Sequence, residues 1–203
     1  MKSYDIGEAD RFLILLTREE GRLAARAPGV RRLKSRMGGS LLSLEHLSVE
    51  IREHGEGWIV AGAHPLPPRH PRLPFQDFLL ATQAMELLLG LLHDEEPLPE
   101  IFDLTLEFLR LPAHAPHHVL TFTLRLFSLL GVLPEAHDRY FDSLPAAERS
   151  FVERSLHGEW QKEPCPFPRV SRLCRELAGE HSTRALRAEL VTEACGCSTT
   201  SRK

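Results

Sequence analysis

A chain of 203 residues with a net charge of -3, 42% hydrophobic and 26% charged residues has the composition of a globular protein of one or two domains. It has no apolar run near the roughly 20 residues that a membrane-spanning helix needs, and its first ten residues lack the apolar region of a secretory signal. We therefore expect a cytoplasmic protein that does not contact a membrane.

Positive charge is concentrated near the N-terminus. Residues 1–36 carry nine Lys and Arg against five Asp and Glu, whereas residues 37–130 carry five against twelve. Four cations lie within six residues of one segment bordered by glycines: Arg31, Arg32, Lys34 and Arg36. A local excess of this size favours a polyanionic partner.

The first 63 residues have the pattern of short β-strands separated by turns. Apolar and alternating positions predict strands over residues 11–17, 22–27, 41–51 and 58–61. Arg18–Gly21 and His54–Gly57 are expected to be the turns that follow two of these strands. Short strands at this spacing indicate a small barrel or sandwich.

A proline-rich segment then separates two patterns. Residues 64–74 contain five prolines, which excludes a helix and predicts an extended linker. Beyond it the apolar period changes to about 3.6, and we expect helices over residues 75–89, 98–109, 119–133, 144–152, 170–178 and 183–194. The expected fold class is α+β, with a β-barrel over 1–63, the linker over 64–74, an α-helical domain over 75–194 and a disordered tail over 195–203.

Four segments, at residues 7–23, 27–35, 122–134 and 172–190, resemble the RecO family of bacterial DNA repair proteins. Residues 7–23 (GEADRFLILLTREEGRL) and 27–35 (APGVRRLKS) are similar to its Glu-x-Asp, Thr-x-Glu-x-Gly and Lys-Gly-Ala-Arg-x-x-Lys-Ser pattern. Residues 122–134 (FTLRLFSLLGVLP) resemble its helix end Phe-Glu-x-x-Leu-Leu-x-x-x-Gly-aromatic-x-Pro, and residues 172–190 resemble its C-terminal helix pair. The resemblance implies an N-terminal OB-fold barrel followed by a helical domain.

The resemblance also implies a function. Such a protein is a mediator of DNA repair and homologous recombination that binds single- and double-stranded DNA without sequence specificity and anneals complementary strands. It helps to load RecA together with RecR, contacts the C-terminal tail of the single-strand-DNA-binding protein, is associated with the nucleoid and needs no cofactor. The alternative is a degenerate relative that keeps a protein-interaction domain without strong DNA binding.

Three departures from the family pattern support that alternative. Only seven residues precede Glu8, so either the start of the chain is misassigned or the barrel lacks its first strand. Residues 135–164 contain no cysteine, whereas many family members carry a four-cysteine zinc ribbon there. Pro28 and Thr123 stand where the family has a lysine and a glutamate.

The basic segment is the principal candidate site, because cations on a glycine-bordered loop can neutralise phosphates. The predicted DNA-binding residues are Arg18, Arg22, Arg26, Arg31, Arg32, Lys34 and Arg36. Only Tyr4, Phe12 and Trp58 could stack on bases, and we expect Phe12 to lie in the core, so stacking should contribute little. For the helical domain, the resemblance implies a site for an acidic peptide tail at Arg110, Arg125, Phe122 and Leu126.

Two groups of potential metal ligands have simpler interpretations. His114, His117 and His118 are interrupted by Pro116, and we expect an exposed interhelical loop rather than a metal site. The four cysteines lack the paired spacing of most zinc sites, and we expect free thiols at Cys165, Cys174, Cys195 and Cys197. The chain contains neither a Walker-type phosphate loop nor a nucleophile elbow, so we expect no enzyme activity.

Overall fold

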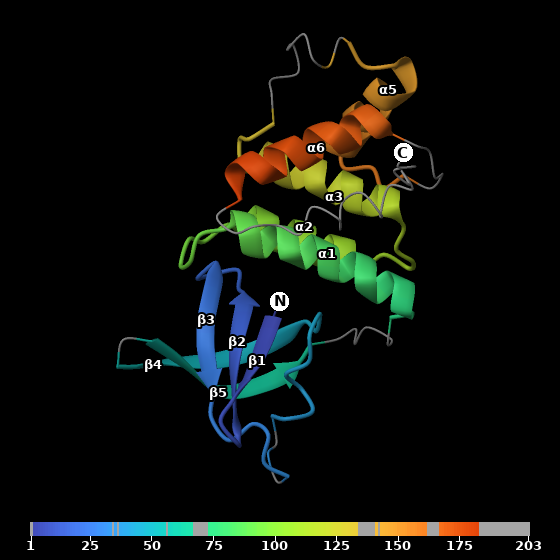
Figure 1. Cartoon of the computed structure of the whole chain (residues 1–203). Coiled ribbons are helices and arrows are strands. Elements are labelled where there is room, and N and C mark those ends of the chain that lie inside the picture. The colour runs from blue at the N-terminus through green and yellow to red at the C-terminus, as the bar shows by residue number, and fades with distance from the viewer. Residues whose placement is uncertain are drawn as a thin grey trace, which may run out of the picture. The chain divides into compact units, whose positions relative to one another are not determined.

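The computed structural model describes residues 2–33, 35, 37–55, 57–66, 73–133, 141, 143–161 and 167–182. The chain divides into two compact units, Met1–Leu73 with Leu92–Leu106 and Pro74–Leu91 with Glu107–Lys203. The first unit contains a β-sheet and the second a group of helices (Figure 1). The expected helix over 183–194, the tail over 195–203 and most of the expected linker lie outside the described residues.

The first unit is built on a five-stranded sheet with the order β1-β2-β3-β5-β4. Neighbouring strands are antiparallel except β3 and β5, which are parallel. This is the five-stranded, partly open Greek-key arrangement of an OB-fold, so the expected fold class is confirmed. The strands are β1 (Lys2–Ile6), β2 (Asp10–Leu16), β3 (Arg22–Ala27), β4 (Leu47–His54) and β5 (Gly57–Pro65).

Two expectations about the strands are wrong: that no strand precedes Glu8, and that one strand covers residues 41–51. Residues 2–6 form a first strand, β1, which pairs with β2 so that Tyr4 lies opposite Phe12. All five residues of β1 are exposed, so no apolar alternation indicated the strand, and its backbone pairing with β2 determines it. The strand expected over 41–51 begins only at Leu47, because Leu44 adopts a left-handed turn conformation with φ of 66°.

The core of the first unit lies on one face of these strands. Successive side chains of a strand point to opposite faces, and the inward positions of β2, β3 and β5 are small or branched apolar residues that pack with the loop after β3. The buried members are Leu13, Ala25, Ala27, Val30, Leu41, Val60 and Ala63. Phe12 is only half buried and lies on the face opposite to Leu13, so it is not the core residue that we expected.

Residues 92–106 complete the first unit and lie against the start of β3. The Glu95 N–H donates to the Arg22 carbonyl oxygen at 2.9 Å, and Trp58 Nε1 donates to the Glu95 carboxylate at 2.9 Å. Gly21, with φ of 66°, is so close to this segment that a Cβ atom there would lie 1.9 Å from the Glu96 carbonyl oxygen. Only glycine fits this position without moving the backbone.

The second unit is organised around one apolar helix. The helices α1 (Phe75–Leu91), α3 (Pro116–Leu129), α5 (Ala146–Leu156) and α6 (Pro168–His181) belong to it, and α2 (Pro99–Leu109) contains residues of both units. In α3, nine of 14 residues are buried, because this helix contacts α1, α5 and α6 (Figure 1). None of the described helices is long and apolar enough to cross a membrane.

The limits of α3 differ from the expected 119–133. The helix begins at Pro116, which occupies its first turn, where the missing N–H costs no hydrogen bond. It ends before Gly131, which has the left-handed φ of 67° that commonly follows a helix. The proline therefore starts the helix rather than interrupting it.

Candidate nucleic-acid interface

The loop that follows β3 is attached to the β1–β2 turn by Asp10. One oxygen of this carboxylate accepts the Gly29 N–H at 2.7 Å, and the other accepts Arg26 Nε at 2.9 Å. The Gly29 hydrogen bond and the Arg26 guanidinium hold the pKa of Asp10 below its usual value of 3.8. The Arg31 N–H also donates to the Ala9 carbonyl oxygen at 2.9 Å, so both ends of this short segment are fixed.

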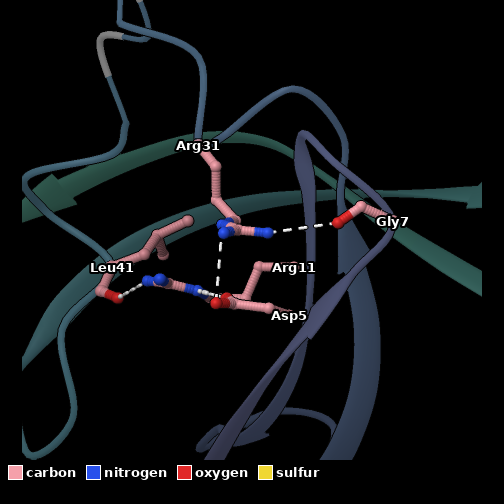
Figure 2. Close-up of polar contacts among 5 residues, drawn as sticks. All are labelled: Asp5, Gly7, Arg11, Arg31 and Leu41. Carbon is pink, nitrogen blue, oxygen red and sulfur yellow. Dashed lines mark hydrogen bonds and ion pairs between the residues drawn. The ribbon is translucent and has the colours of Figure 1, made fainter.

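A second aspartate of the hairpin contacts two arginines from different segments. Asp5 in β1 lies 3.0 Å from Arg11 Nε and 3.4 Å from Arg31 Nε (Figure 2). Each guanidinium also donates to a backbone carbonyl oxygen, Arg11 to Leu41 at 3.5 Å and Arg31 to Gly7 at 3.1 Å. Two cations thus converge on one carboxylate beside the β1–β2 turn.

The structure separates the predicted DNA-binding arginines into two groups. Arg26, Arg31 and Arg32 are exposed and lie at the end of β3 near the two aspartates, and Arg32 is close enough to lower the pKa of Asp10 further. Arg22 lies at the other end of β3, about 13 Å from Arg26 because a strand rises about 3.3 Å per residue, and Arg18 precedes that end of the strand. Lys34 and Arg36 lie outside the described residues.

The second of these groups has partners in residues 92–106. Arg22 is 9% exposed, and its Nε lies 2.6 Å from Asp94. Arg18 lies 2.9 Å from Asp103 with about half of its side chain exposed. We therefore assign Arg22 to the packing of the first unit and leave it out of the interface.

Sequence reasoning missed Arg11. It lies in the apolar run of β2, directly opposite Asp5 in the register of β1 and β2. An oppositely charged pair across two strands would have indicated the contact, but only once residues 2–6 were recognised as a strand. The Glu8-x-Asp10 motif resembles a family signature, but nothing in the sequence indicates that Asp10 accepts a hydrogen bond from the loop after β3.

The outward face of the sheet carries a row of larger side chains. Tyr4, Phe12 and Arg26 are cross-strand neighbours on β1, β2 and β3. Tyr4 is 43% exposed, and Lys2 Nζ lies 5.5 Å from the centroid of its ring. Of these residues, Phe12 and Arg26 lie on β2 and β3, the strands through which OB-folds bind oligonucleotides, and Tyr4 lies beside them on β1.

The residues expected to bind a peptide tail do not form an open site in the second unit. Phe122 and Leu126 have no exposed surface, because both face the core from α3. Arg125 donates to the Glu107 carboxylate at 2.9 Å and lies 5.2 Å from the centroid of the Trp160 ring. Arg110 is exposed just after α2.

The histidine segment is buried, and its expected assignment as an exposed loop is wrong. His114 and His117 are 8% and 7% exposed. His117 and His118 donate from Nε2 to the Gln161 carbonyl oxygen at 3.0 and 2.8 Å, while His118 Nδ1 accepts the Ala115 N–H at 3.1 Å. Burial lowers the pKa of both His117 and His118, with a further decrease from a neighbouring histidine.

These histidines therefore have structural partners. Within the described ranges, no group of three His, Cys, Asp or Glu side chains could hold a metal ion. Cys174 is buried in α6, and the other three cysteines are not among the described residues.

Comparisons with known proteins agree with the OB-fold and the helical unit. Residues 1–59 match the family Recombination protein O N terminal, and residues 75–177 match Recombination protein O C terminal. The DNA repair protein RecO of Myxococcus xanthus is 35% identical over 179 residues, which cover 81% of this chain and 69% of the relative. The proteins of the same name from Streptomyces griseus and a Nocardioides species are 31% and 33% identical over 74% and 66% of this chain.

The chain spans 69%, 66% and 58% of the length of these three relatives. Both family matches fall on the segments that carry the Glu-x-Asp motif, the basic loop and the apolar α3 helix. The chain belongs to the recombination protein O (RecO) family.

Proposed function

We propose that this protein acts in DNA repair as a recombination mediator without catalytic activity. Its relatives are named DNA repair proteins, and its two halves match the two parts of the recombination protein O family. In this proposal, residues 1–63 bind single- and double-stranded DNA without sequence specificity, and residues 75–194 bind proteins. Strand annealing, RecA loading with RecR and contact with the single-strand-DNA-binding protein rest on the family resemblance.

One observation carries the DNA-binding part of the proposal. Among the described residues at the β1–β2 turn, its flanking strand ends and the loop after β3, the four cations Arg11, Arg26, Arg31 and Arg32 lie beside the carboxylates of Asp5, Glu8 and Asp10. Four cations against three anions leave an excess of positive charge, which attracts phosphates and releases counterions from DNA. In OB-folds, the loop between the first two strands is one of the elements that bind oligonucleotides.

The outward row of β1, β2 and β3 supports a second component of binding. Tyr4 and Arg26 are exposed, and both side chains can stack on bases whatever the sequence. Contacts to phosphates and ring faces carry little sequence information. Binding through this surface should therefore depend on salt and only weakly on base sequence.

The test is a salt titration of binding to a fluorescent oligothymidylate, followed by anisotropy. If three to five phosphates are neutralised, log K should fall against log[salt] with a slope of about -2 to -4. Replacing Arg31, Arg32, Lys34 and Arg36 with alanine should bring the slope to about -1 or flatter. Arg52→Ala is the control, because Arg52 is an exposed arginine of β4 that pairs with Glu50.

Two outcomes would change the proposal. An unchanged slope in the fourfold variant would remove the basic segment from the interface. Absence of any binding by the wild-type protein at low salt would support the degenerate relative that binds proteins but not DNA.

A further inference from the structure

Arg11 and Arg31 have the arrangement of an anion-binding site, and the anion between them is the carboxylate of Asp5. Arg11 comes from β2 and donates from Nε to one oxygen of the carboxylate at 3.0 Å, while Arg31 comes from the loop after β3 and its Nε lies 3.4 Å from the other oxygen (Figure 2). A DNA phosphodiester presents the same features as this carboxylate: two oxygens that share one negative charge. Guanidinium groups bind both kinds of anion with the same planar arrangement of donors.

We propose that Arg11 and Arg31 form a binding site for one backbone phosphate of DNA, and that the Asp5 carboxylate occupies this site in the absence of DNA. This proposal rests on the proposed DNA binding of the first unit and names one of its contacts. Arg11 is thereby added to the interface, and Asp5 becomes a competitor of the ligand.

Each of the two guanidiniums also has a contact that does not involve Asp5. Arg11 is attached to the Leu41 carbonyl oxygen and Arg31 to the Gly7 carbonyl oxygen, both through Nη1. These backbone contacts use Nη1, and Nε of each arginine lies within 3.4 Å of a carboxylate oxygen at the anion position. A phosphate that replaces the carboxylate therefore enters a prepared site, and the two cations hold one negative charge before and after the exchange.

Of the two aspartates of the hairpin, Asp5 is the one whose carboxylate a ligand can displace from its arginine partners. Its side chain is 51% exposed on β1, a strand at the end of the sheet, and it forms ion pairs with the two arginines. Exposed ion pairs of this kind contribute little to stability, because water and salt screen them. Asp10 differs, since its side chain is 17% exposed and it accepts the Gly29 N–H that attaches the loop.

The experiment compares Asp5→Asn with a matched variant, Glu50→Gln. Glu50 is 59% exposed and pairs with Arg52 at 2.6 Å on β4, so both variants remove one carboxylate from an arginine pair and change the net charge equally. At about 0.1 M salt we expect Asp5→Asn to bind oligothymidylate about three- to tenfold more tightly, with a slope more negative by about 0.7. Glu50→Gln should change the affinity less than twofold.

The role of Arg11 is tested in the same titration. Arg11→Gln should weaken binding and abolish the gain in the double variant Asp5→Asn/Arg11→Gln. An equal gain in Glu50→Gln, or a gain that persists without Arg11, would show a general effect of net charge and overturn the proposal.

The failures of the two proposals are distinguishable. If the wild-type protein binds DNA and Asp5→Asn binds it no better, the phosphate site is wrong while the DNA-binding function stands. If the wild-type protein does not bind DNA at any salt concentration, the proposed function itself fails. Circular dichroism verifies that Asp5→Asn is folded, and Asp5→Ser is the second variant if it is not.

Discussion

Asp10 in the first unit and Glu148 in the second both accept hydrogen bonds from the backbone of a distant segment, but their surroundings differ. Asp10 receives one N–H, from Gly29, and shares its charge with the exposed Arg26. Glu148 is 5% exposed and receives two, from Arg169 at 3.0 Å and Val170 at 2.9 Å, in the first turn of α6. Phe167, at the start of that helix, provides no side-chain cap.

The same contrast extends to other polar groups of the two units. Around the β1–β2 turn, arginines pair with carboxylates at the surface, where water weakens each pair. In the second unit, His117 is buried and bound to a backbone carbonyl oxygen, where an unmet hydrogen bond would be costly. The comparison indicates that the buried polar contacts of the helical unit, such as those of Glu148 and His117, serve stability, whereas the ion pairs beside the hairpin are exposed to solvent.

The largest expected effect is in the second unit. Glu148→Ala leaves two N–H groups of α6 without their acceptor, and we expect the free energy of unfolding of this unit to fall by about 2 to 4 kcal/mol. The two tryptophans lie one in each unit, so urea unfolding of Trp58→Phe protein, followed by Trp160 fluorescence, reports the second unit. Glu153→Ala is the control, because Glu153 is an exposed residue of α5, the helix that contains Glu148. A loss below about 0.5 kcal/mol would contradict the comparison.

The next effect is a pH dependence of the second unit. Burial holds the pKa of His117 and His118 below 6.5, so their contribution to stability is complete above pH 6.5 and decreases as the pH falls toward the lowered pKa. Each histidine can lower the free energy of unfolding by up to about 1.4 kcal/mol per pH unit in that window. Protonation of His118 also removes the acceptor of the Ala115 N–H.

Trp160 reports this change, because its ring lies 6.2 Å from that of His118. Urea unfolding at pH 7.5, 6.5 and 5.5 should show the decrease in wild-type protein and a shallower decrease in His117→Gln. A free energy of unfolding that stays constant over this range would contradict the prediction.

A smaller effect is expected at Asp10 in the first unit. Asp10→Asn removes the ion pair with Arg26 and weakens the acceptor of the Gly29 N–H, so amide exchange at Gly29 should be several-fold faster. In wild-type protein the pKa of Asp10 is below 3.8, so its contribution is present above that pH and is lost as the pH falls through the lowered pKa. Hydrogen exchange by NMR measures the Gly29 exchange rate in Asp10→Asn and its pH dependence in wild-type protein, with Glu50→Gln as the control. An unchanged Gly29 amide would show that the loop does not depend on Asp10.

The smallest effect on stability is expected at Asp5. Because its pairs with Arg11 and Arg31 are exposed, Asp5→Asn should change the free energy of unfolding of the first unit by less than about 0.5 kcal/mol. Unfolding followed by Trp58 fluorescence in Trp160→Phe protein measures this unit. A larger loss would show that Asp5, like Glu148, contributes to the stability of its unit and is not a displaceable anion.

Much of the fold was predictable because its signals are local. The change from alternating strands to a 3.6-residue period predicted the α+β class, and the apolar positions of α3 predicted a buried helix. Strand β1 was not predictable in this way, because its five residues are all exposed and its conformation depends on hydrogen bonds to β2.

The candidate site shows the same limit. The sequence by itself determined that positive charge is concentrated between residues 18 and 36 and that the chain resembles the RecO family. Only the tertiary structure decided which arginines are exposed beside the hairpin, that Arg22 pairs with Asp94, and that Arg11 shares Asp5 with Arg31. Charge and periodicity are properties of neighbouring residues, whereas ion pairs and burial depend on segments that meet only when the chain folds.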